Sequence, residues 1–98
     1  MSDTVKNMSV QKDGFPNDTL TIKRKDHVCF IQSGTDAPST VTVPSTLFEN
    51  GVTSCVVNEP NAHDKTTYKV VGPDGDYTVN LPSSLKAIAD AGTIKVNG

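Results

Sequence analysis

The stretch TTYKVVGPDGDYTVNL, from Thr66 to Leu81, decides the fold because it predicts two β-strands joined by a turn. Apolar and polar side chains alternate on both sides of the turn, which is the pattern of strands with one buried face. The turn is Gly72-Pro73-Asp74-Gly75, in which proline presets φ and glycine permits a positive φ. We therefore expect a β-hairpin, with Leu81 in phase with Tyr77 and Val79 and facing the core.

The same alternation predicts short strands along most of the chain. Residues 1–15 are weakly patterned and hold a first strand with Val5, Met8 and Val10. Val28 and Phe30 share one face of a later strand, and Cys29 lies on the other. Further strands are expected at 19–23, 27–32, 40–43, 52–57 and 93–97, with a helical turn or an irregular piece at 45–50.

Residues 82–92 have the pattern of a short helix instead. Serines can cap its first turn, and Leu85, Ile88 and Ala89 share one face. Gly92 is expected to end it. The whole chain, residues 1–98, therefore predicts one all-β domain, an antiparallel Greek-key β-sandwich of seven to eight strands with one short helix before the last strand.

Charge and hydropathy exclude some classes of function. The formal net charge is −2 and the pI is about 5.5, whereas nucleic-acid binding requires a basic face. The one basic run, Lys23-Arg24-Lys25, is expected to be a solvated turn between strands. No apolar run has the roughly 20 residues of a membrane span. The chain is cytoplasmic if Met1 is its native start, and periplasmic or secreted if Met1 was added to a mature domain.

The two cysteines, Cys29 and Cys55, leave two alternatives open. A disulfide between them would stabilise the fold by about 2–4 kcal/mol. The other alternative is a pair of reduced, half-buried thiols, which an intracellular compartment would favour.

The order and spacing of the predicted strands resemble those of the cupredoxins, the plastocyanin-like blue-copper sandwiches, over residues 16–97. Gly75-Asp76-Tyr77 is similar to the Gly-x-Tyr that leads to the copper cysteine in that family. The other similar segments are 16–22 with 27–30, 39–43, 67–70 and 92–96.

The ligands of a blue-copper site are missing from this chain. Such a site needs two imidazoles and a thiolate, usually with a weak axial thioether. The positions that resemble the ligand positions hold Pro38 or Ser39 for the first histidine, Leu81 for the cysteine, Ser84 for the second histidine, and Ala89 or Asp90 for the axial methionine. The resemblance therefore implies a copper-free domain.

Other metal or catalytic sites have little support in the sequence. His27, Cys29, Cys55 and His63 have the side chains of a zinc site but not the spacing of a compact zinc motif. His27 and His63 are expected at opposite ends of the sandwich, as ordinary surface residues. There is no Gly-x-Ser-x-Gly elbow and no phosphate-binding glycine loop, so we expect no enzyme and no cofactor.

We therefore expect a non-enzymatic binding or structural module. Its contact surface would be the end loops 33–39, 58–64 and 82–91, and its partner a protein or a small molecule. The alternative is a metal-binding or electron-transfer protein with a non-standard site at His63, Asp64 or Cys55.

Overall fold

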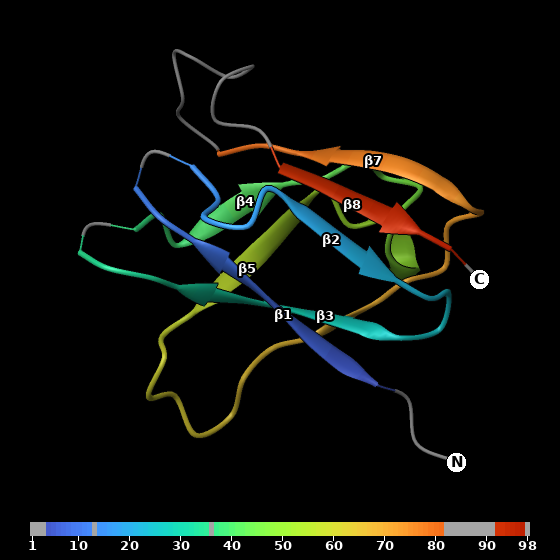
Figure 1. Cartoon of the computed structure of the whole chain (residues 1–98). Coiled ribbons are helices and arrows are strands. Elements are labelled where there is room, and N and C mark those ends of the chain that lie inside the picture. The colour runs from blue at the N-terminus through green and yellow to red at the C-terminus, as the bar shows by residue number, and fades with distance from the viewer. Residues whose placement is uncertain (1–3, 13, 36, 82–91, 98) are drawn as a thin grey trace.

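The computed structural model describes residues 4–12, 14–35, 37–81 and 92–97, which form two β-sheets (Figure 1). The first sheet contains β1, β3, β4, β5 and β6, and the second contains β2, β7 and β8. The strands are β1 (Val5–Val10), β2 (Thr19–Ile22), β3 (His27–Gln32), β4 (Thr40–Thr42), β5 (Ser54–Asn58), β6 (Tyr68–Lys69), β7 (Gly75–Val79) and β8 (Gly92–Val96). A 3₁₀ turn, η1, spans Glu49–Gly51. The all-β class is confirmed, and the expected helix before β8 lies outside the described residues.

The two sheets are mixed, so the expected antiparallel arrangement is wrong. β1 pairs with β3, β2 with β8, and β3 with β5, all in parallel. For β1 and β3 the reason is that the chain changes sheets between neighbouring strands. β1 belongs to the first sheet, β2 to the second and β3 to the first again. Two such crossings return the chain to its original direction, which makes β1 and β3 parallel.

The expected hairpin at Thr66–Leu81 is also wrong, although the two strands exist. β6 pairs with β3, and β7 pairs with β8 in the other sheet. The segment between them therefore crosses from one sheet to the other. The Tyr77 hydroxyl donates a hydrogen bond of 2.6 Å to the Pro73 carbonyl and fastens this crossing. At Gly72 a Cβ would lie 2.5 Å from Tyr77 Oη and 2.8 Å from the Thr46 carbonyl oxygen, so only glycine fits.

The core lies between the two sheets, where Val28 and Phe30 of β3 meet the buried face of the second sheet. Leu81 is 7% exposed and belongs to this core, which confirms its predicted orientation. The segment before η1 contributes more to the core than its sequence indicated. Leu47 and Phe48 are fully buried there, and the Phe48 ring stands edge-on to Phe30 with centroids 6.2 Å apart.

One side of the pair of sheets is closed and the other is open. On the closed side, Thr42 of β4 and Asn80 exchange two main-chain hydrogen bonds of 2.7 and 2.9 Å, which join the sheets. On the open side, β1 and β2 are the outer strands of their sheets. There Lys6 Nζ donates a hydrogen bond of 2.8 Å to the Thr21 carbonyl across the gap. The described residues contain no helix with the length and hydropathy needed to cross a membrane.

Candidate functional site

The loops after β1, β3 and β5 gather at one end of the molecule, which we call the loop end (left in Figure 1). They gather there because these three strands are parallel, so that their carboxyl ends meet at one edge of the sheet. Loops 33–39 and 58–64 were predicted to share this end. The loops after β3 and β5 do lie there, but Asn58 belongs to β5 and the second loop spans residues 59–67. Loop 82–91, the third predicted member, lies outside the described residues.

Asn58 fastens loop 59–67 to the first sheet. It is the last residue of β5, not the first of a polar loop as the sequence suggested, and only 6% of its surface is exposed. Its amide nitrogen donates hydrogen bonds of 2.9 Å to the carbonyls of Phe30 and Thr66, and its amide oxygen accepts one of 2.8 Å from Thr66 N. Asn58 therefore holds the loop in one position. The sequence did contain a signal for this position: Asn58 lies two residues after Val56, and residues two apart on a strand share one face, here the outer one.

The two cysteines lie on opposite faces of the first sheet, and both are free thiols. Cys55 points into the core between the sheets. Cys29 lies on the outer face, where the Asn58 amide nitrogen approaches its Sγ at 3.6 Å. Because alternate residues of a strand point to opposite faces, a Cys29–Cys55 disulfide would require the sheet to rearrange. Both thiols are fully buried, 1% exposed for Cys29 and 0% for Cys55, and not half-buried as the second alternative expected.

Burial makes both thiols poor nucleophiles. It raises the pKa of Cys55 to about 12. It also raises the pKa of Cys29, an effect that the nearby Lys65 ammonium and the hydrogen bond from Asn58 reduce. Since the thiolate is the reactive and metal-binding form, neither cysteine is activated for chemistry at neutral pH.

The remaining candidate ligands do not converge. His27 begins β3 and lies at the end opposite the loop end, whereas His63 and Asp64 are exposed in loop 59–67. This separation of the two histidines was predicted. The chain is folded so that Cys55 lies in the core while His63 lies in solvent. No group of three or more His, Cys, Asp or Glu side chains that could hold a metal ion occurs within residues 4–12, 14–35, 37–81 and 92–97.

The position that resembles the copper cysteine does not fit a metal. Leu81 fills it with a buried apolar side chain that has no ligand atom. Ser39, which resembles the first histidine position, is exposed immediately before β4. Ser84, Ala89 and Asp90 lie outside the described residues.

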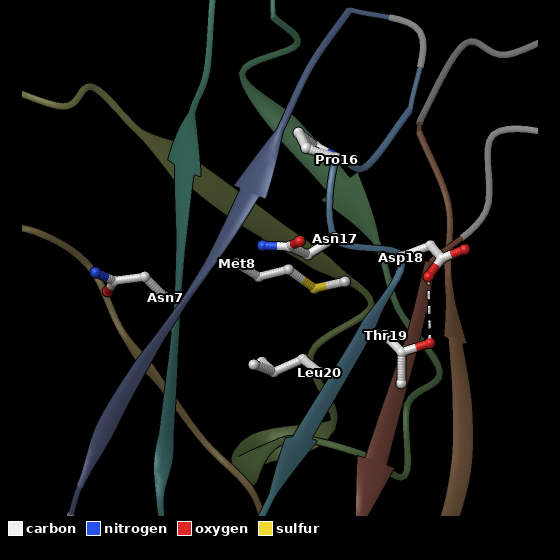
Figure 2. A pocket seen from close by; sticks show the side chains of 7 residues that line it. All are labelled: Asn7, Met8, Pro16, Asn17, Asp18, Thr19 and Leu20. Atoms are coloured by element: carbon white, nitrogen blue, oxygen red, sulfur yellow. Dashed lines mark hydrogen bonds between the residues drawn. The ribbon is translucent and has the colours of Figure 1, made fainter.

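Two of the surface hollows are lined by described residues. One, of about 190 Å³, lies at the loop end and is lined by Gln11, Lys12, Ser33, Gly34 and Thr35. The other, of about 260 Å³, lies on the open side, between β1 and β2. Figure 2 shows the Met8 and Leu20 side chains pointing into it, with Asn17 reaching toward β1. The sequence indicated neither hollow, because both form between segments that only the fold brings together.

The chain matches no protein-family model, and no curated protein is similar to it.

Proposed function

We propose that this chain is a non-enzymatic, copper-free, cupredoxin-like module with a Greek-key sandwich architecture that acts by binding a partner through its loop end. The observation that carries the proposal is the separation of its reactive side chains. Cys55 is in the core, Cys29 is beneath Asn58, and His27 and His63 are at opposite ends. General acid–base or nucleophilic chemistry needs such groups within hydrogen-bond reach of one another.

The loop end has the properties of a binding surface. The five-stranded sheet supplies a rigid support, and Asn58 fixes loop 59–67 on it through three short hydrogen bonds. A loop held in one conformation loses less conformational entropy when a partner binds. Apart from Pro60, the exposed side chains of loop 59–67 are polar and of both charges, including Glu59, Asp64 and Lys65, which suits a polar partner.

The first experiment is elemental analysis of the purified protein after exposure to copper(II) and zinc(II), with the thiols kept reduced. We expect less than stoichiometric metal after dialysis, because the described candidate ligands do not converge. One tightly held ion per chain would contradict the copper-free proposal and would revive a non-standard site at His63, Asp64 or Cys55.

The second experiment maps binding directly. A library of small polar fragments is added to the isotope-labelled chain, and amide chemical shifts are recorded by NMR. Shifts confined to residues 33–39 and 59–67 would support the loop end as the binding surface. Shifts centred on the hollow between β1 and β2 would contradict it.

A further inference from the structure

The turn between β2 and β3 holds three exposed cations in a fixed position. They are Lys23, Arg24 and Lys25, at the end opposite the loop end (right in Figure 1). Lys25 has a φ of 81°, a left-handed conformation that few non-glycine residues adopt. Its amide donates a hydrogen bond of 2.8 Å to the Val70 carbonyl, and the Asp26 amide donates one of 3.1 Å to Lys23 O. The first bond ties the turn to the segment that follows β6, and the second closes the turn itself.

Two further cations lie beside this turn. The Lys6 ammonium, on β1, is held at the Thr21 carbonyl, two residues before Lys23. Lys69, on β6, is paired with His27 in the ladder between β6 and β3. We call the surface formed by Lys6, Lys23, Arg24, Lys25 and Lys69 the basic end.

The described carboxylates of the same end, four in number, are fewer than its six described cations, Lys95 included. Asp26 lies within the turn and accepts a hydrogen bond of 3.4 Å from the Thr4 amide. Asp76 lies opposite another cation, Lys95, in the ladder between β7 and β8. Glu49 and Asp74 lie on two other connections, the η1 turn and the crossing before β7. The β2–β3 turn itself has three cations, Lys23, Arg24 and Lys25, and one carboxylate, Asp26.

Exposed apolar side chains accompany the basic end. Three large apolar side chains among the described residues are markedly exposed: Val5, Val56 and Val71. Two of them are here. Val5, 51% exposed, is paired with His27 between β1 and β3, and Val71, 43% exposed, follows the residue that accepts the bond from Lys25.

We propose that the basic end docks on an anionic lipid surface. Lysine and arginine side chains are attracted to the negative potential of such a surface, and exposed apolar side chains can enter its interface. The net charge of −2 does not prevent this docking. The longest dimension of the molecule is 36 Å, and the carboxylates of the loop end lie well beyond the screening length of about 8 Å at physiological ionic strength.

An anionic lipid surface fits these observations better than a nucleic acid does. Recognition of single-stranded nucleic acid uses aromatic side chains on which bases stack, and the apolar side chains here are valines. The proposal concerns the end opposite the loop end, so it goes beyond the proposed function and does not depend on it.

The test is partitioning onto phospholipid vesicles that contain roughly 30% phosphatidylserine, compared with neutral phosphatidylcholine vesicles. We expect binding to the anionic vesicles alone at about 0.1 M salt and its loss at about 1 M. Lys25→Gln should weaken partitioning about fivefold, the effect of one basic residue near such a surface. The matched control is Lys65→Gln, the same charge change at the loop end, which should alter partitioning by less than about twofold.

The Val71→Ser variant distinguishes binding to a lipid surface from binding to other polyanions. It should weaken vesicle partitioning and leave retention on immobilised heparin unchanged, because heparin has no apolar interior. The proposal is overturned if the protein does not partition onto anionic vesicles, if Lys25→Gln and Lys65→Gln have equal effects, or if heparin retains the chain while vesicles do not.

Discussion

Replacing the buried Asn58 by alanine tests the inference that one amide holds loop 59–67. The substitution removes three hydrogen bonds of 2.8–2.9 Å, two to Thr66 and one to the Phe30 carbonyl. Each such bond contributes about 1 kcal/mol net to stability. The free energy of unfolding should therefore fall by about 3 kcal/mol, and Tm by roughly 12–24 °C.

Urea unfolding followed by circular dichroism measures this loss, and hydrogen exchange at the Thr66 amide reports whether the loop is released. Asn61→Ala is the matched control, because Asn61 is an exposed amide in the same loop; its effect should stay within about 0.5 kcal/mol. A loss below about 1 kcal/mol for Asn58→Ala, or one no larger than that of Asn61→Ala, would refute the reasoning.

A variant of the same position adds a pH dependence. Asn58→Asp places a buried carboxylate against the carbonyl oxygens of Phe30 and Thr66, which raises its pKa in the folded state. A carboxyl group whose pKa is higher in the folded state adds stability while it is protonated, below its unfolded pKa of about 3.9. This stability is lost as the pH rises through the folded pKa. The free energy of unfolding of Asn58→Asp should therefore be closest to that of the unmodified chain near pH 4 and should be much lower at pH 7.

Three other substitutions test the core, the crossing and the buried thiol. Leu81→Ala should cost about 2–4 kcal/mol in urea unfolding, because Leu81 is a buried core residue; a loss under 1 kcal/mol would place its side chain elsewhere. Gly72→Ala should lower Tm even when paired with Tyr77→Phe, since its Cβ would still lie 2.8 Å from the Thr46 carbonyl oxygen; full rescue by the second change would contradict the close packing. Cys55 has a folded pKa of about 12, above the 9.0 of a free thiol. Its thiol therefore contributes fully to the free energy of unfolding below pH 9, and this contribution falls by about 1.4 kcal/mol per pH unit between pH 9 and the folded pKa. Cys55→Val should reduce this alkaline slope, and an unchanged slope would assign it to other groups.

The candidate site was only partly predictable from the sequence. Loops 33–39 and 58–64 were expected at one end, and the structure places the loops after β3 and β5 together there, the second with bounds 59–67. Asn58 was assigned to a polar loop because the run NEPNAHD is polar throughout. Its role depends on Thr66, eight residues later, coming back to it. Local composition contains no information on such a return, so the fixed loop could not be found before the fold was known.

The basic end shows the same division between local and distant information. The run Lys23-Arg24-Lys25 was correctly expected in a connection between strands. That Lys6 and Lys69 lie beside it follows from the pairing of β1 and β6 with β3. The basic end is assembled from β1, β6 and the turn before β3, so it depends on how these strands pair and not on the sequence of any one segment.

By itself, the sequence determined the all-β class, the positions of most strands and the side chains that face the core. These follow from the alternation of apolar residues, because a strand that buries one face must repeat every two residues. The tertiary structure decided which strands pair and in which direction. Alternation is the same for a strand paired in a hairpin and for one that crosses to the other sheet, as β6 and β7 show. Pairing is chosen by main-chain hydrogen bonds and by packing between segments far apart in the chain, and neither leaves a mark in the local pattern of residues.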